Sequence, residues 1–303
     1  MRKQYAKQKK AMGQTKPIVS YAMMFPYLFL FSIFTVLPVL LSVFLSFTHF
    51  NILEAPTLIG LKNYVKLLTE DDIFLLAIKN TLLLAIVTGP VSYLLSLLVA
   101  YLINELTPRL RALVTLVFYA PSISGNVYLI WTMLFSGDSY GFVNGLLKNW
   151  GIITTPIQFF TDTEYMMPMV MIVTLWMSLG NSFLSFIAGL QGIDRQYYEA
   201  GAIDGIRNRW QELWFITLPL MKPQLLFGAV MNITASFGVG SVVTGLVGFP
   251  SNEYAVHTIM HHLEDYGSIR FEMGYASAIA TVLFMMMFAS NILIKRVLRR
   301  VGT

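Results

Sequence analysis

Apolar runs of about 20 residues recur along the whole chain, and they restrict its possible folds more than any other feature. Six such runs occur, at residues 18–47, 75–103, 110–135, 167–190, 224–246 and 273–298. Each run is long enough to cross the hydrocarbon core of a bilayer as an α-helix. Charged residues make up 12% of the chain, about half their share in soluble domains. We therefore predict an all-α polytopic membrane protein with six transmembrane helices.

The charged residues divide unequally between the two sides of these predicted spans. The side that carries both termini holds sixteen of the 21 lysines and arginines but only five of the 16 acidic residues. The positive-inside rule assigns that side to the cytoplasm. A basic tail at residues 1–17, a short tail at residues 299–303 and the loop at residues 191–223 are then all cytoplasmic. The net charge of +5 follows from this topology, and we expect no nucleic-acid partner.

The loop at residues 191–223 is strongly polar, with four acidic and four basic residues. It indicates two short helices, whose start and break signals are Asp194, Asp204, Gly205, Asn208 and Gln211. We expect the second helix to end before Pro219. Large side chains give the loop apolar anchors: Tyr197, Tyr198, Trp210, Leu213 and Trp214. A folded aromatic loop of this kind is typical of a surface that binds another protein.

Three pieces of this loop have a distinctive spacing: Glu199-Ala200-Gly201, then Gly205, then Ile216-Thr217-Leu218-Pro219. Together they resemble the EAA loop of permease subunits from bacterial binding-protein-dependent ABC importers. Two departures stand out. Gly201 replaces the usual alanine, and the ten residues between Gly205 and Ile216 are one more than usual. The resemblance implies a site that couples to an ATPase, formed by Glu199, Ala200, Gly201, Asp204, Gly205, Arg207, Ile216, Leu218 and Pro219.

Other stretches resemble the maltose-type, or multiple-sugar, subclass of these permeases. They include Ile59-Gly60-Leu61-Lys62-Asn63-Tyr64, Asn80-Thr81 and Gly274-Tyr275-Ala276-Ser277-Ala278. This resemblance implies the type I ABC importer permease fold at residues 18–298 and a place in the bacterial cytoplasmic membrane. It also implies several partners: a second, different permease subunit, a cytoplasmic ATPase dimer that binds Mg-ATP, an external solute-binding protein, membrane lipid, and a carbohydrate substrate, mostly an oligosaccharide.

The chain lacks the residues for several kinds of chemistry. No glycine-rich loop ending in Gly-Lys-Ser or Gly-Lys-Thr is present, so we expect neither ATP hydrolysis nor a cofactor on this chain. His257 and His261 are spaced like metal ligands on one helix face, with His262 and Glu264 close by. We expect these histidines to be solvated in an external loop and to bind no metal. The chain is therefore predicted to be a translocation subunit and not an enzyme.

Polar residues inside the spans are candidates for a substrate path. The fourth and fifth spans carry most of them: Trp176, Ser178, Asn181 and Ser182 in one, and Asn232, Thr234 and Ser236 in the other. Ser178 and Ser182 share a helix face, as do Asn232 and Ser236. These faces can line a path for a neutral sugar, with Trp176, Asn181, Ser182, Asn232 and Ser236 as its residues. The alternative is that they hold neighbouring helices together.

A secondary transporter or a channel for a small neutral solute is the alternative function. Ion-coupled carriers usually place ionisable residues inside their spans. Here such residues lie only near span ends, at Lys79, Lys295 and Arg296. This distribution favours a neutral solute and movement driven by a partner. Dependence of uptake on ATP, measured with and without a proton ionophore, separates the two functions.

Overall fold

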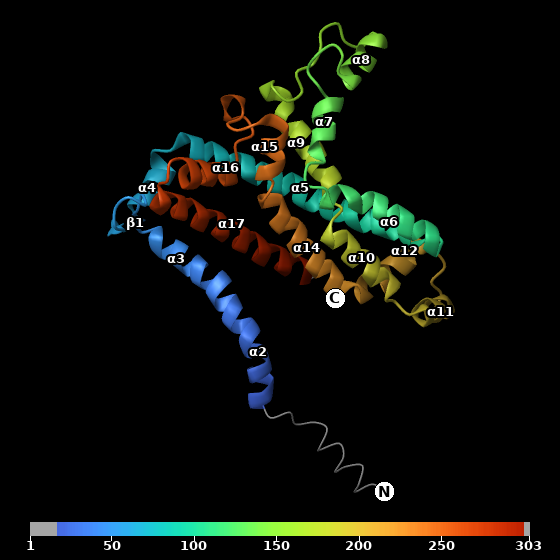
Figure 1. Ribbon diagram of the computed structural model, residues 1–303. Coiled ribbons are helices and arrows are strands. Elements are labelled where there is room, and N and C mark those ends of the chain that lie inside the picture. The colour runs from blue at the N-terminus through green and yellow to red at the C-terminus, as the bar shows by residue number, and fades with distance from the viewer. Residues whose placement is uncertain (1–16, 300–303) are drawn as a thin grey trace.

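In the computed structural model, which describes residues 17–299, the first span is one apolar helix. It comprises α2 (Pro17–Phe31), a π-helical turn η1 (Ser32–Val36) and α3 (Leu37–Leu45). The expectations for the outermost tails fall on residues 1–16 and 300–303, outside the described residues. In Figure 1, α3 lies beside α17 (Met273–Arg299) whereas α2 extends away from the rest of the protein, and the apolar side chains of this span are largely exposed.

A small folded segment, made of two short strands and one helix, follows the first span. β1 (Thr48–His49) pairs with β2 (Thr57–Leu58) in an antiparallel two-stranded sheet, and α4 (Lys62–Thr69) comes next. Asn63 is buried, and its Nδ2 donates to the carbonyls of Ser46 and Thr48, each at 2.9 Å. The stretch that resembles sugar-type permeases therefore fastens α4 to the end of the first span.

The second span is the central helix of the fold. α5 (Asp72–Asn104) has 33 residues and is about 50 Å long at 1.5 Å per residue. It packs against α4, α9 (Thr163–Met177), α10 (Asn181–Gln191), α14 (Lys222–Phe237) and α16 (Ile259–Glu264). Apolar clusters bury Phe74 and Ala77 near its start, Leu84 in its middle, and Ala100 and Ile103 near its end. Figure 1 shows α5 running behind the other spans from one end of the molecule to the other.

Three of the six predicted spans are not single helices. The third breaks into α6 (Pro108–Ile123) and α7 (Tyr128–Leu134), which meet at an angle of 87°. The fourth is interrupted between Met177 at the end of α9 and Asn181 at the start of α10, and the fifth breaks at Gly238 between α14 and α15 (Gly240–Val247). α14 alone has 16 residues, about 24 Å, which is shorter than a hydrocarbon core. Average hydropathy cannot detect such breaks, because the residues on both sides are apolar.

Length and composition of the described helices agree with the predicted number of spans. Four described segments are long and apolar enough to cross a membrane: Tyr21–Leu45, Asp72–Asn104, Thr163–Gln191 and Met273–Val297. The number reaches six if each of two bent helix pairs counts as one span, Pro108–Ile123 with Tyr128–Leu134 and Arg209–Leu220 with Lys222–Phe237. The last span is α17 (Met273–Arg299). The fold is therefore the predicted all-α polytopic one, with bends that the sequence did not reveal.

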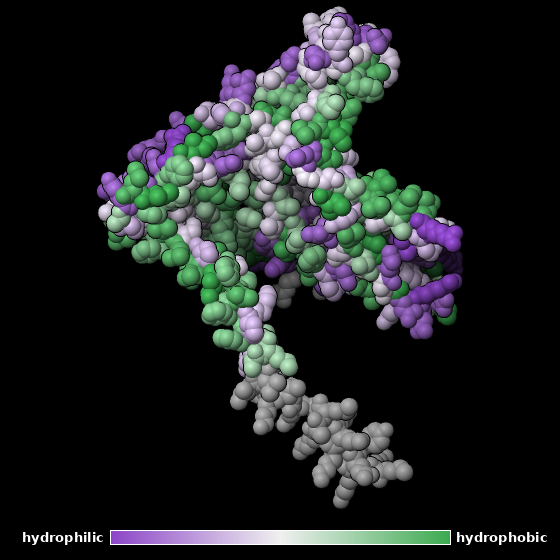
Figure 2. Space-filling model, in the orientation of Figure 1, coloured by the Kyte–Doolittle hydropathy of each residue, from purple (hydrophilic) through white to green (hydrophobic). Residues whose placement is uncertain are grey.

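The remaining short elements lie at the ends of the spans. α8 (Phe142–Asn149) stands on a projecting loop, and η3 (Asn252–Tyr254), α16 and η4 (Asp265–Ile269) connect α15 to α17. Figure 2 shows hydrophilic surface near α4 and, at the opposite end, over α11 (Arg195–Ile203) and α12 (Arg209–Glu212), with hydrophobic surface between. This division is the one expected of a protein whose middle lies in lipid.

Candidate functional site

The polar loop between the fourth and fifth spans folds as two short helices joined by a tight turn. The Asp194 carboxylate caps α11 by accepting a backbone N–H bond of 3.0 Å. At the other end, the Ile206 N–H donates to the Gly201 carbonyl at 2.9 Å, and Gly205 has a φ of +92°. These are the features of a Schellman motif, which needs a left-handed residue at this position. The predicted start and break of the first helix are confirmed.

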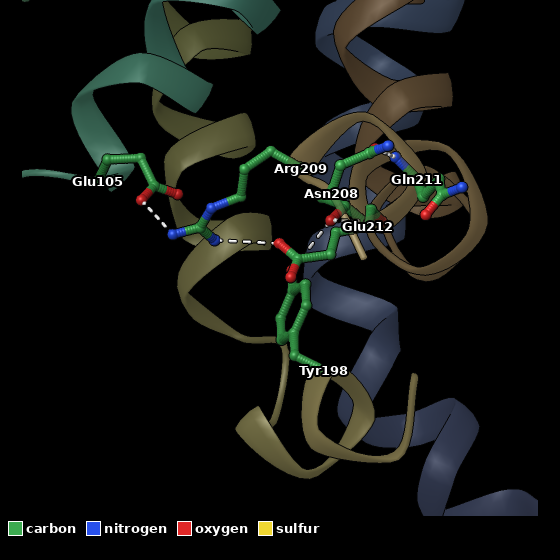
Figure 3. A network of polar contacts seen from close by, with 7 residues as sticks. Glu105, Tyr198, Asn208, Arg209, Gln211 and Glu212 are labelled. Carbon is green, nitrogen blue, oxygen red and sulfur yellow. Dashed lines mark hydrogen bonds and ion pairs between the residues drawn. The ribbon is translucent and has the colours of Figure 1, made fainter. Parts of the chain in front are cut away.

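The start of the second helix is also confirmed, with one difference. The Asn208 side chain accepts a hydrogen bond from the Gln211 N–H at 2.8 Å (Figure 3). The Gln211 side chain in turn accepts from the Arg207 N–H at 2.9 Å. In a standard capping box this second bond comes from the capping residue itself, one position later. The two bonds fix where α12 begins.

The second helix does not end before Pro219, so this prediction is wrong. It widens into a π turn, η2 (Leu213–Thr217), and continues as α13 (Leu218–Leu220). The Leu218 N–H donates to the Leu213 carbonyl, five residues back. Because a π turn holds an extra residue, it changes which carbonyls face the proline ring and lets the helix continue. The segment between Gly205 and Ile216 in this chain is likewise one residue longer than in the usual motif.

Gly201, the other departure from the usual motif, packs against this π turn. A Cβ atom at Gly201 would lie 2.5 Å from the Ile216 Cδ1 atom. Both residues are buried, so an alanine requires the Ile216 side chain to shift. Close by, the hydroxyls of Tyr198 and Thr217 share a hydrogen bond of 3.0 Å. The two departures thus meet at one contact, which joins α11 to η2.

Most of the other predicted coupling residues lie on the surface. Glu199, Ala200, Asp204, Gly205, Arg207 and Pro219 are exposed, and Leu218 is half-buried. Glu199 pairs with Arg195 at 3.2 Å, but both side chains are so exposed that the pair contributes little. Among the predicted apolar anchors, Tyr198 and Leu213 turn inward, while Tyr197, Trp210 and Trp214 are exposed. The exposed set offers aromatic and charged groups on one short loop.

A cavity of about 260 Å³, called the polar cavity below for the hydroxyl and amide groups in its otherwise apolar wall, lies between the helices in the middle of the chain. Four of the predicted path residues line it, namely Asn181, Ser182, Asn232 and Ser236, together with Ser178. The Ser182 hydroxyl donates to the Asn232 Oδ1 atom at 2.9 Å, so α10 and α14 are also bonded here. The buried Nδ2 atom of Asn232 has no acceptor among the described residues. A buried amide donor of this kind can bind a hydroxyl group of a solute or a water molecule.

The cavity differs from the predicted path at several residues. Trp176 does not line it, because its ring packs edge-on against Trp131 with centroids 5.6 Å apart. Thr234 is exposed and also lies outside it. The prediction missed Thr174 and two residues of α5, Thr88 and Ser92. Single hydroxyl residues in an apolar helix are common, so only their spacing of four, which puts them on one face, could have indicated the site.

Comparison with known proteins assigns the chain to a family. Residues 92–303 match the family described as "Binding-protein-dependent transport system inner membrane component". The chain belongs to this family. It is 31% identical to the probable ABC transporter permease protein YesP of Bacillus subtilis, over 88% of this chain and 85% of that protein. It is 32% identical to the lactose transport system permease protein LacF of Rhizobium radiobacter, over 70% of each chain.

A solved structure gives the same assignment. The chain resembles a subunit of a bacterial ABC transporter involved in the import of the acidic polysaccharide alginate, with a TM-score of 0.73 and 25% identity. The likeness covers 94% of this chain and 96% of that subunit. The chain is therefore a multi-pass permease component of a binding-protein-dependent ABC transporter, and the expected type I permease fold is confirmed.

The three histidines of the permease's last long loop are buried, so our expectation that they are solvated is wrong. The His262 Nε2 atom bonds the Asp71 carboxylate at 3.0 Å, and its Nδ1 atom bonds the His257 Nε2 atom at 3.3 Å. His261 bonds Thr258 and the Gly240 carbonyl, at 2.8 and 3.1 Å. No group of three or more possible metal ligands occurs among residues 17–299. His262 instead holds the loop to Asp71 at the start of α5, and His261 holds it to α15.

Burial changes the ionisation of this histidine cluster. It lowers the pKa of His257 to about 4, and the neighbouring His261 and His262 act in the same direction. Burial also lowers the pKa values of His261 and His262. The histidines are therefore neutral at physiological pH.

The same loop is also bound directly by α5. The Asn80 Nδ2 atom donates to the carbonyls of Ala255 and His257 at 3.1 and 3.0 Å.

Proposed function

We propose that this permease carries a neutral carbohydrate through the cavity lined by Asn181, Ser182, Asn232 and Ser236. The single observation that supports this most is the chemistry of the cavity wall. It presents amides and hydroxyls from α5, α9, α10 and α14 beside apolar side chains such as Met177, Met231 and Val242, and none of its lining residues is charged. A neutral sugar offers many hydroxyl groups and no charge, so a wall of uncharged donors and acceptors beside apolar groups suits it. The name of the relative LacF, a lactose transport permease, supports a neutral carbohydrate. The similar transporter imports alginate, which is acidic, so it supports a carbohydrate but not a neutral one.

The loop of α11, α12, η2 and α13 is proposed to bind a cytoplasmic ATPase. Exposed aromatic side chains beside exposed charged groups are typical of the central contacts of protein interfaces. The ATPase dimer would bind Mg-ATP and supply the energy, and this chain would supply half of the translocation path. The other proposed partners are a second, different permease subunit and an external solute-binding protein, as the family description implies.

This function requires one orientation in the membrane. The ATP-binding partner is cytoplasmic, so the loop that contains Glu199 must face the cytoplasm together with both termini. The excess of lysine and arginine on that side supports this orientation. The histidine-bonded loop and the projecting α8 would then face the solute-binding protein.

Transport by the reconstituted complex tests the proposal. The permease, its partner permease and the ATPase are incorporated into vesicles, the binding protein is added, and uptake of radiolabelled lactose, arabinotriose and sn-glycerol 3-phosphate is measured. We expect uptake of a neutral sugar that requires ATP and is unaffected by a proton ionophore. Uptake abolished by the ionophore and independent of ATP would support the secondary transporter instead. Uptake of the phosphate ester alone would contradict a path for neutral sugars.

A further inference from the structure

One arginine connects the proposed coupling loop to the central helix of the fold. The Arg209 guanidinium reaches two carboxylates at once (Figure 3). Its Nη1 donates to the Glu212 Oε2 atom and its Nη2 to the Glu105 Oε2 atom, both at 3.0 Å. Glu212 belongs to the same short helix, whereas Glu105 is the residue that ends α5. The second bond therefore crosses from the loop to a membrane span.

Both ends of this bridge are held in place by other contacts. On one side, the Arg111 Nη2 atom donates to the Asn104 and Leu106 carbonyls, at 2.8 and 3.1 Å, one on each side of Glu105. On the other side, the Asn208 cap fixes the turn of α12 from which Arg209 extends. These contacts fix the backbone at both ends of the bridge. The Arg209 and Glu105 side chains are themselves exposed, so the pair alone shifts an equilibrium at most about five-fold, equivalent to about 1 kcal/mol.

The loop behind Arg209 is itself a connected unit. The contact of Gly201 with Ile216 and the bond of Tyr198 to Thr217 join α11 to η2. Because η2 continues directly from α12, these contacts also join α11 to the helix that carries Arg209. At the other end of the bridge, α5 carries Thr88 and Ser92 in the wall of the polar cavity. The bridge thus connects the loop to the cavity wall on α5, in addition to the continuous chain that joins the loop to α10 and α14.

We propose that Arg209 is a positioning residue, which ties the coupling loop to α5 so that movement of the loop moves the cavity wall. The inference rests on the proposed function, in which an ATPase moves this loop. Lysine has one point charge and cannot hold two carboxylates in the fixed geometry of a guanidinium. Loss of the bridge would let the ATPase dock and hydrolyse ATP while less solute is carried for each ATP.

The test measures the number of lactose or arabinotriose molecules, whichever the wild type carries, transported per ATP by the reconstituted complex. For Arg209→Gln and Glu105→Gln we expect a fall of about five-fold, equivalent to about 1 kcal/mol, the upper end for exposed pairs. The number of molecules transported per ATP should be no lower in the double variant than in Arg209→Gln alone, because both changes remove the same bond. Arg209→Lys should be intermediate. Arg109→Gln, which removes an exposed arginine at the start of α6, should match the wild type.

A distance measurement on the permease alone separates this inference from the proposed function. The sequence contains no cysteine, so spin labels can be attached at Leu102→Cys on α5 and Ile203→Cys on α11, both exposed positions. We expect a narrow distance distribution in the wild type and in Arg109→Gln, and a broader one in Arg209→Gln and Glu105→Gln. Unchanged distances and unchanged solute per ATP in Arg209→Gln would overturn the inference alone. A wild-type permease that binds no ATPase would overturn both proposals.

Discussion

At the scale of the residue, glycine is required at position 205 by the backbone conformation and not by a lack of space for a side chain. No atom lies within 4 Å of the position that a Cβ would occupy, but the φ of +92° is strained for residues with a side chain. We expect Gly205→Val to be folded in the membrane yet to lose ATP-driven uptake and retention of the ATPase during purification. The left-handed conformation costs a residue with a Cβ about 1–2 kcal/mol.

Gly205→Asn is the matched control for this prediction. Asparagine tolerates positive φ better than other residues with side chains, and the open space accommodates its amide. It should therefore retain more of the uptake and of the bound ATPase than Gly205→Val. Equal, wild-type behaviour of both variants would show that the turn is only a tolerant connection. Glu199→Lys reverses an exposed charge without altering the backbone, and we expect it to weaken ATPase binding.

Two asparagines of the polar cavity give a second prediction at this scale. We expect Asn232→Leu and Asn181→Leu to abolish sugar uptake while the assembled complex still hydrolyses ATP, since leucine supplies no hydrogen bond to a solute. Thr234→Leu is the control, because Thr234 lies on the same helix but outside the cavity. Normal uptake in both asparagine variants would place the path elsewhere. Loss of assembly instead of uptake would support a role in holding α10 to α14 through the Ser182 bond.

At the scale of the element, the loop between α15 and α17 is expected to weaken in acid. His257, with a pKa lowered from 6.5 to about 4, stays neutral in the folded protein while the unfolded chain takes up protons. The contribution of neutral His257 to the free energy of unfolding is therefore intact above pH 6.5. It is lost as the pH falls from 6.5 towards 4, by at most about 1.4 kcal/mol per pH unit. The groups that act on it are His261, His262, Asp265 and Asp71.

The measurement for this element is the unfolding temperature of the solubilised permease between pH 7.5 and 4.5. We expect His257→Gln to be less stable at neutral pH but to have a shallower decline than the wild type below pH 6.5. His49→Gln, which changes an exposed histidine, should decline like the wild type. Identical slopes in all three proteins would show that burial of His257 does not control the acid response.

At the scale of the whole molecule, the sequence predicted what depends on average composition and on local caps. Long apolar runs identified α5 and α17, and the capping residues Asp194 and Asn208 located the loop helices. The sequence did not predict the features that depend on packing between residues far apart in the chain. The bend between α6 and α7 leaves hydropathy unchanged, and the direction of the Trp176 ring depends on Trp131, which is distant in sequence. The buried bond of His262 likewise involves a residue far along the chain, Asp71.

The orientation of the molecule in the membrane is the property on which the coupling proposal depends most. The unequal division of lysine and arginine predicts that the α11–α13 loop faces the cytoplasm and that the loop carrying α8 faces outward. Because the chain has no cysteine, single cysteines can report each side. Tyr140, on the α8 loop, is 97% exposed, and Arg109, at the start of α6, is also exposed.

In intact cells, we expect a membrane-impermeant thiol reagent to label Tyr140→Cys and to leave Arg109→Cys unlabelled. After the membrane is permeabilised, both should react, which controls for burial of either thiol in the assembled complex. The charge difference favours this arrangement because moving the lysine- and arginine-rich segments outward opposes the bias that sets topology. The reverse labelling pattern would place Glu199 and Arg209 outside the cell, beyond the reach of a cytoplasmic ATPase, and would therefore contradict both the coupling loop and the bridge to α5.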